Sequence, residues 1–244
     1  TGLPEGLPVA RGAADNAAGA VGLGVVRHGR AMASIGTSGV VLAHTPGYAV
    51  EPAMRLHSFC HAVPGEHYAM GVMLSAGGAL RWYRDVLGDG ERLAAEMRRV
   101  DAYEIIGDTA STARAGAGGL IFLPYLMGER TPHNDALARG AFIGLSATTS
   151  RGAMFRAVLE GLALDAANIL KAMLRHLGRS APERILAIGG STRNELLMRL
   201  KATAYATPVD VLDLPITGRE EDAVDQLSAW ILLDGAEGDQ AVLD

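Results

Sequence analysis

The sequence has a single cysteine, Cys60, so no disulfide can form within the chain. Disulfides are common in secreted proteins and rare where thiols are kept reduced. Long apolar runs are also missing, because none reaches the roughly 18 to 20 residues that a membrane-spanning helix needs. The first residues, Thr-Gly-Leu-Pro-Glu-Gly, have neither the basic nor the apolar part of a secretion signal. We therefore expect a cytoplasmic protein with no membrane partner.

A large excess of charge of one sign is missing as well. The formal net charge is -5, and the clusters of Lys and Arg are short. Basic residues do not interleave with aromatic ones in the way that nucleic-acid-binding surfaces require. We expect no nucleic-acid partner.

Apolar residues are plentiful, at 49% of 244 residues, which is enough to bury the core of one large domain. Between residues 12 and 47, turn residues separate short apolar runs at intervals typical of hairpins. After residue 118, strand and helix patterns alternate, which is typical of an α/β sheet. The sequence therefore predicts an α/β domain with a mixed sheet, interrupted by a flexible, glycine-rich loop around residues 107–118.

The clearest helix begins at Ser150, where apolar residues recur at helical spacing as far as Gly178, a residue suited to a left-handed cap. A strand ending near residue 76 gives way to a helix at the glycine pair that follows. The other expected helices cover residues 92–100, 194–206 and 220–233. The expected strands cover 21–26, 31–35, 40–42, 120–123, 184–188 and 209–212, with a polar loop at 128–135.

A first candidate site lies in Gly-Ala-Ala-Asp-Asn-Ala-Ala-Gly-Ala at residues 12–20, where the carboxylate of Asp15 stands among side chains too small to shield it. Such a carboxylate could act as the general base that accepts a hydroxyl proton during phosphoryl transfer. It could equally be the N-cap of an alanine-rich helix. The segment alone leaves both interpretations open.

Two further segments carry glycines beside polar donors. In Ser34-Ile-Gly-Thr-Ser-Gly39, hydroxyls at a hairpin tip could bind phosphate oxygens, or the segment could be a plain turn. In Gly189-Gly-Ser-Thr-Arg-Asn194, glycines join a strand to a helix, whose amino end attracts anions. Asn194 could bind a base edge or only cap that helix.

His57, Cys60 and His61 could suggest a metal site. The segment is typical of a strand, in which residues 57 and 61 would stand about 13 Å apart at roughly 3.3 Å per residue. One zinc ion, with ligand bonds near 2 to 2.3 Å, could not join them. We predict no metal site there.

Taken in order and spacing, these segments resemble the carboxyl-terminal domain of the FGGY carbohydrate kinases, and within that family the bacterial xylulokinases. The resemblance spans nearly the whole chain. The matching segments are residues 14–20, 35–40, 57–61, 75–83, 122–126, 128–135, 139–145, 156–161 and 189–191.

The resemblance implies an actin/hexokinase-like (ribonuclease H-like) ATPase domain with a mixed sheet flanked by helices. It implies ATP-dependent phosphorylation of a ketopentose, D-xylulose to D-xylulose 5-phosphate, with Mg²⁺ accompanying the phosphates. Asp15 matches the catalytic base, and Asp15 and Asn16 match residues that hold the sugar. The positions that match the ATP site are Thr37, Ser38, Gly77, Arg81, Gly189, Gly190 and Asn194.

In that family an amino-terminal domain carries the first phosphate loop and most of the sugar-recognition residues, and none of these matches residues 1–244. We therefore expect the chain to be the carboxyl-terminal, nucleotide-binding domain and, by itself, inactive. Two alternatives remain: an FGGY kinase for another ketose or polyol, and a nucleotide-binding domain without catalysis. A homodimer is possible in each case.

Overall fold

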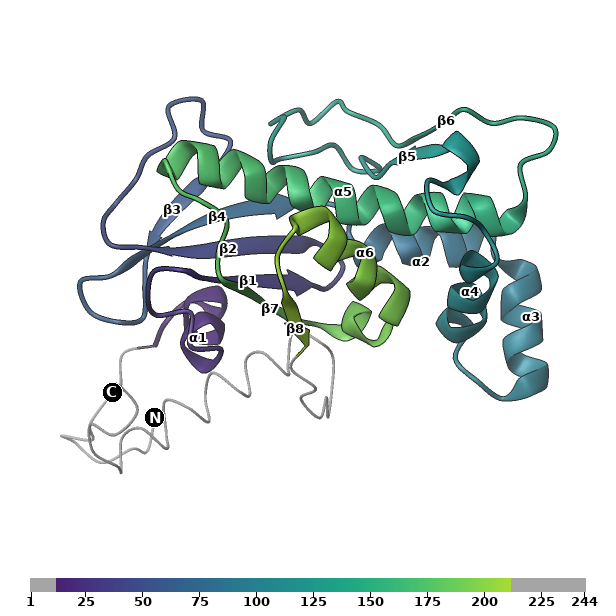
Figure 1. Cartoon of the computed structure of the whole chain (residues 1–244), viewed down its shortest axis with the longest axis horizontal. Coiled ribbons are helices and arrows are strands. Elements are labelled where there is room, and N and C mark those ends of the chain that lie inside the picture. The colour runs from purple at the N-terminus through teal and green to yellow at the C-terminus, as the bar shows by residue number, and fades with distance from the viewer. Residues whose placement is uncertain (1–11, 212–244) are drawn as a thin grey trace, which may run out of the picture.

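The computed structural model describes residues 12–211, and its centre is a six-stranded mixed sheet (Figure 1). The strand order is β3-β4-β2-β1-β7-β8. Neighbours from β3 to β1 pair antiparallel, whereas β7 pairs parallel with both β1 and β8. The strands are β1 (Arg30–Ile35), β2 (Gly39–Thr45), β3 (His57–Cys60), β4 (His67–Met73), β7 (Arg184–Ile188) and β8 (Val209–Val211).

Helices cover both faces of this sheet. They are α1 (Asp15–Gly22), α2 (Gly77–Val86), α3 (Asp89–Arg98), α4 (Ala102–Ser111), α5 (Arg151–Leu177) and α6 (Glu195–Tyr205), with the 3₁₀ turns η1 (Ala117–Gly119) and η2 (Gly190–Arg193). Successive side chains of a strand point to opposite faces. Met32 accordingly packs with the alanines of α1, while Ala31 and Ala33 pack in the core that contains α5. The predicted mixed α/β sheet is confirmed.

The long helix α5 forms as predicted. The hydroxyl oxygen of Ser150 accepts a hydrogen bond from Ala153 N at 3.1 Å, and Gly178 closes the helix with a φ of 60°. Fourteen of its residues are buried. The helix packs on the main sheet along one part of its length and contacts α2 and α4 beyond the ends of the strands (Figure 1). Over the described residues, no helix is both long and apolar enough to cross a bilayer.

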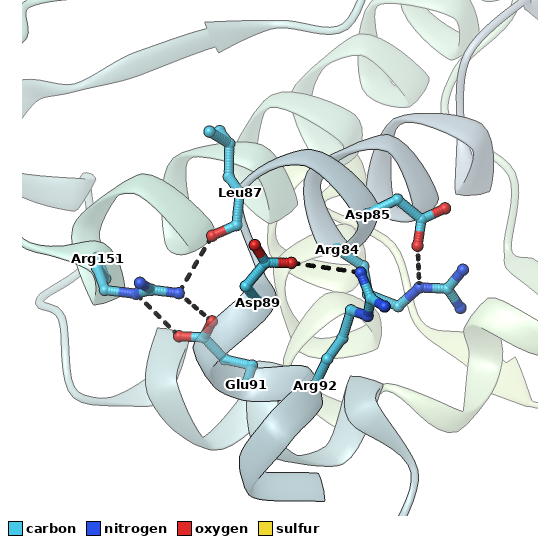
Figure 2. Close-up of polar contacts among 7 residues, drawn as sticks. All are labelled: Arg84, Asp85, Leu87, Asp89, Glu91, Arg92 and Arg151. Atoms are coloured by element: carbon cyan, nitrogen blue, oxygen red, sulfur yellow. Dashed lines mark hydrogen bonds and ion pairs between the residues drawn. The ribbon is translucent and has the colours of Figure 1, made fainter. Parts of the chain in front are cut away.

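An arginine at the start of α5 holds α3 and the end of α2 in place (Figure 2). The Arg151 guanidinium donates to both carboxylate oxygens of Glu91 on α3, and also to the carbonyl oxygen of Leu87, 3.1 Å away. Glu91 is buried, so this ion pair is shielded from solvent on one side. The pairs Arg84–Asp85 and Arg92–Asp89 lie on the surface of the same two helices.

Two sequence predictions are wrong here. Residues 21–26 form the end of α1 and the turn after it, because the small residues of α1 pack closely on the sheet and Gly24 adopts a positive φ of 66°. Residues 107–118 do not form one flexible loop. The helix α4 occupies residues up to Ser111, and the carboxylate of Asp101 caps it by accepting from Tyr103 N at 2.8 Å.

The remaining elements agree with expectation except in detail. The predicted strand at 120–123 is β5 (Ile121–Leu123), but it pairs only with β6 (Ala141–Ile143) in a separate small sheet. The predicted helix at 92–100 begins three residues earlier, as α3. The predicted helix at 220–233, and residue 212 of the last predicted strand, lie outside the described residues.

Candidate functional site

A cavity of about 630 Å³ opens at the carboxyl ends of β1 and β7. Its walls come from the β1–β2 turn, α2, α4, η2 and the first turn of α6. Cavities of roughly 300–1,000 Å³ hold typical small molecules and cofactors. In open α/β sheets, ligands bind outside the carboxyl ends of parallel strands, which is where this cavity lies.

Five of the predicted ATP-site residues line this cavity: Thr37, Gly77, Arg81, Gly190 and Asn194. The other two, Ser38 and Gly189, do not line it, although each is next in sequence to a residue that does. Three segments that are far apart in the sequence thus meet at one cavity.

The glycine that begins α2 allows its close packing against the β1–β2 turn. A Cβ on Gly77 would lie 2.4 Å from the carbonyl oxygen of Gly36, much closer than two such atoms can approach. The amides of Gly77 and Gly78 donate to Gly36 O and Thr37 O, each at 2.9 Å. The turn and the helix therefore form one rigid unit, from which the exposed hydroxyls of Thr37 and Ser38 project.

Asn194 acts as the N-cap of α6, since its side-chain oxygen accepts from Leu197 N at 2.9 Å. Its side-chain nitrogen would lie 3.6 Å from a Cβ on Gly107, so the amide lies against α4. The capping interpretation is confirmed, whereas contact with a base stays a prediction.

The wall contributed by α4 was missed by sequence reasoning. Tyr103, Glu104, Gly107 and Asp108 all line the cavity. Burial is the main cause that raises the pKa of the Tyr103 hydroxyl, and the Arg84 guanidinium lies 5.1 Å from the centre of its ring. The available signal was Asp101 followed three residues later by Glu104, a spacing typical of a helix start.

Asp15 is exposed in the first turn of α1, and Ala14 is the N-cap. The interpretation of Asp15 as an N-cap is therefore wrong. Its carboxylate instead accepts from the backbone and side-chain nitrogens of Asn16, at 2.6 and 3.2 Å. Neither residue lines the nucleotide-sized cavity, so the structure does not bring them together with the glycine turn in one pocket.

The helix α1 is nevertheless attached to the strand that leads to that turn. Ala17 and Ala20 belong to the same buried cluster as Ile188, the residue before Gly189. The pKa of the Tyr68 hydroxyl, in the same cluster, is raised mainly by burial and secondly by the negative charge of Asp15.

The predicted strand through His57 and Cys60 is present as β3. Nowhere in residues 12–211 do three or more His, Cys, Asp or Glu side chains gather closely enough to hold a metal ion.

Beyond the cavity, the loop at 128–135 packs deeply onto α5. Glu129 and Asp165 are both almost fully buried, with 1% and 3% of their surfaces exposed. Glu129 accepts hydrogen bonds from Leu74 N at 3.2 Å and Arg130 N at 2.7 Å. Burial, followed by the neighbouring charge of Glu129, raises the pKa of Asp165 to about 8.

Comparison with known proteins places the chain in a family. A family model described as "FGGY family of carbohydrate kinases, C-terminal domain" matches residues 31–215. Xylulose kinase from Staphylococcus epidermidis is 39% identical over 204 residues, covering 84% of this chain and 39% of that protein. Gluconokinase from Bacillus subtilis is 30% identical over 211 residues, covering 86% of this chain and 40% of that protein.

Solved structures agree. The crystal structure of xylulose kinase from Rhodospirillum rubrum superposes with a TM-score of 0.79 at 34% identity, covering 99% of this chain and 45% of that one. The expected actin/hexokinase-like fold is confirmed by these relatives. The chain spans about two fifths of the length of the curated relatives it matches.

A second family model, described only provisionally as that of a metallopeptidase, matches residues 202–244. Most of that segment lies outside the described residues. It contains neither histidine nor cysteine, two of the side chains on which zinc sites mostly depend. We therefore do not infer a peptidase activity from this match.

The first model matches well over half of the chain, and its boundaries include the β1–β2 turn, α2, α4, the glycine turn and the start of α6, all of which line the cavity. The chain belongs to the FGGY family of carbohydrate kinases.

Proposed function

We propose that this protein takes part in transferring the terminal phosphoryl group of ATP to a ketopentose, D-xylulose, as the carboxyl-terminal domain of an FGGY kinase. The observation that carries the proposal is the cavity of about 630 Å³, in which the β1–β2 turn meets the glycine turn of η2. In a sugar-kinase family, a cavity of this size at the carboxyl ends of parallel strands suits a nucleotide.

The orientation of ATP in this proposal follows from the chemistry of the walls. Thr37 and Ser38 offer exposed hydroxyls, which suit phosphate oxygens. Gly190 and Asn194 also line the cavity, as does Tyr103, which contributes an aromatic ring from α4. We propose that the adenosine lies between η2 and α4 and that the phosphates extend toward the β1–β2 turn.

Asp15 is proposed as the general base. Its exposed carboxylate can accept the proton of the sugar hydroxyl as the oxygen of that hydroxyl bonds to the phosphorus and the bond to ADP breaks. Asn16, which donates to this carboxylate, is proposed to orient it and to hold the sugar.

The opposite wall of the active site is proposed to come from outside residues 1–244, because the chain spans about two fifths of its curated relatives. Excluding water and aligning the acceptor supply a large part of enzymatic rate enhancement. We therefore propose that the chain binds ATP weakly and, by itself, turns over no sugar. A cytoplasmic location and a homodimer stay predictions.

Mg²⁺ is proposed to enter with the nucleotide. This ion keeps several waters and binds through one or two carboxylates and the phosphates of the substrate, rather than through a cage of protein ligands. The lack of a cluster of metal-binding side chains in residues 12–211 is compatible with that mode of binding. When bound, the ion would neutralise charge on the phosphates.

A second candidate substrate is a sugar acid or another sugar, since a gluconokinase is 30% identical to this chain. The deciding measurement is ADP release by the complete gene product with ATP, Mg²⁺ and a panel of D-xylulose, other ketoses, polyols and gluconate. The proposal expects kcat/KM to be highest for D-xylulose. A higher value for gluconate would replace the substrate, and no turnover with any acceptor would leave only nucleotide binding.

A further inference from the structure

A second cavity, of about 670 Å³, lies apart from the nucleotide-sized one and shares no lining residue with it. Residues from three places form it: Glu51 to Leu56 after β2, Pro132 and His133 in the loop before β6, and the second half of α5. None of the residues proposed for the kinase reaction lines this cavity.

The two loops that form its walls are joined by a buried hydroxyl. Thr131, which is fully buried, donates from Oγ1 to the carbonyl oxygen of Arg55 at 2.7 Å. Oγ1 of Thr131 in turn accepts from Val72 N on β4 at 3.1 Å. Both loops are thereby fixed to the sheet before any ligand arrives, which lowers the entropy lost on binding.

The charge of this cavity is strongly positive. Arg55, Lys171 and Arg175 line it. The one carboxylate among the lining residues, Glu51, accepts from the Arg55 side chain at 2.5 Å and from Arg55 N at 2.9 Å. These hydrogen bonds hold the pKa of Glu51 at about 2, so it stays ionised and orients the arginine. Lys171 and Arg175 leave an excess of two positive charges.

Spacing along α5 directs these groups into one cavity. Asn168, Lys171 and Arg175 follow each other at intervals of three and four residues and therefore share one face of the helix, while His176 lies four residues after Ala172, which also lines the cavity. Nε2 of His176 is buried and, within the described part of the chain, has no hydrogen-bond partner. His133 faces the same space from the opposite loop.

We propose that this basic cavity is a binding site for a small phosphate-bearing molecule, separate from the nucleotide site. A guanidinium group can bind two phosphate oxygens at once through a pair of N–H donors. The ammonium group of a lysine adds a further charged donor. Leu56 and Ala172 supply an apolar surface against which a short carbon skeleton can lie. The volume exceeds that of a free phosphate and suits a phosphorylated metabolite the size of a sugar phosphate.

The test uses isothermal titration of the 244-residue chain with three probes: ribose 5-phosphate, inorganic phosphate and ribose. The double variant Lys171→Gln/Arg175→Gln should weaken binding of ribose 5-phosphate at least tenfold and leave ATP affinity within twofold. The single variant Lys171→Gln should give a smaller loss in the same direction. Arg92→Gln, which removes a matched exposed arginine on α3, should change neither affinity.

The relative affinities identify the source of the phosphate. Ribose 5-phosphate binding more tightly than inorganic phosphate would indicate a phosphorylated metabolite, and equal affinities would indicate free phosphate; both support the site. Unchanged binding of ribose 5-phosphate by the double variant would overturn it. So would ribose binding as well as its phosphate, or the absence of saturable binding by both phosphate probes.

Discussion

Gly189 lies so close to Ile35 that a Cβ on the glycine would come within 2.4 Å of the carbonyl oxygen of Ile35. Ile35 ends β1, and Gly189 follows β7, the strand paired with β1 in parallel. The β1–β2 turn and the glycine turn, which both line the nucleotide-sized cavity, are therefore held together by backbone packing. Glycine is needed at this position for two reasons: only a residue without a Cβ can approach Ile35 so closely, and the backbone has a positive φ of 99°.

Gly189→Ala is expected to destabilise the fold and weaken ATP binding. The added methyl group must displace β1, and the residue must keep a φ of 99° with a ψ of 160°, a region almost restricted to glycine, at a combined cost of more than about 2 kcal/mol. Gly178→Ala is the matched control, because Gly178 also has a positive φ but a Cβ there meets no atom within 4 Å. Thermal unfolding of both variants checks the prediction, which equal losses in Tm would contradict.

Gly190→Val is expected to reduce ATP affinity at least tenfold while D-xylulose binding to the complete gene product persists. Gly190 opens η2 and lines the cavity, so a branched side chain there would occupy space proposed for the nucleotide. Calorimetric titration with ATP measures the effect. Unchanged ATP affinity in a variant that keeps its Tm would remove η2 from the proposed site.

Asp15→Ala in the complete gene product is expected to lower kcat by roughly 100-fold or more, the usual contribution of a general base. Because Asp15 is exposed and does not line the cavity, the affinity for ATP should stay within about twofold. Asp89→Ala, a change of an exposed carboxylate in the first turn of α3, serves as the control. Phosphorylation of D-xylulose at the normal rate by the Asp15 variant would refute its role as base.

Lys201→Met is expected to stabilise the protein at neutral and acidic pH. Burial lowers the pKa of Lys201 from 10.5 to about 7, so between these values the unfolded chain holds a proton that the folded chain has released. The contribution of Lys201 to stability therefore rises with pH from about 7 to 10.5, at up to about 1.4 kcal/mol per pH unit. Urea unfolding across this range should show a shallower slope for the variant. An equal slope would show that Lys201 is not the group responsible.

Asp165→Asn is expected to stabilise the protein at mildly alkaline pH. The pKa of Asp165 is raised from 3.8 to about 8, so between these values the folded state holds a proton that the unfolded state has lost. The contribution of Asp165 to stability thus falls as pH rises through this window, and the neutral amide should remove that decline. Unfolding in urea at pH 5 and pH 8 gives the comparison. A variant that loses as much stability as the native protein over this interval would contradict it.

Local signals in the sequence were sufficient for elements whose ends are marked by their own residues. Ser150 and Gly178 delimit α5 because a hydroxyl cap and a left-handed glycine are short-range features. Likewise, the turn between β1 and β2 follows from glycines flanking Thr37 and Ser38. The order of such segments was also enough to identify the family, which the comparisons confirm.

Other features depended on distant parts of the chain. The start of α4 is marked in the sequence by Asp101 and Glu104, but its place beside the cavity comes from packing against α3 and α5, so its contribution to the cavity wall could not be foreseen. The same is true of β6, which forms only because β5 offers an edge to pair with.

The sequence by itself determined the sheet type, the long helix, the family and five residues of the nucleotide-sized cavity, because caps, turns and motif order are encoded locally. Only the tertiary structure decided that Asp15 lies outside that cavity, that Gly189 packs on Ile35, and that Arg55 and Arg175 line a common basic pocket. These relationships join residues many positions apart, and burial and backbone packing, which no local pattern records, bring them together.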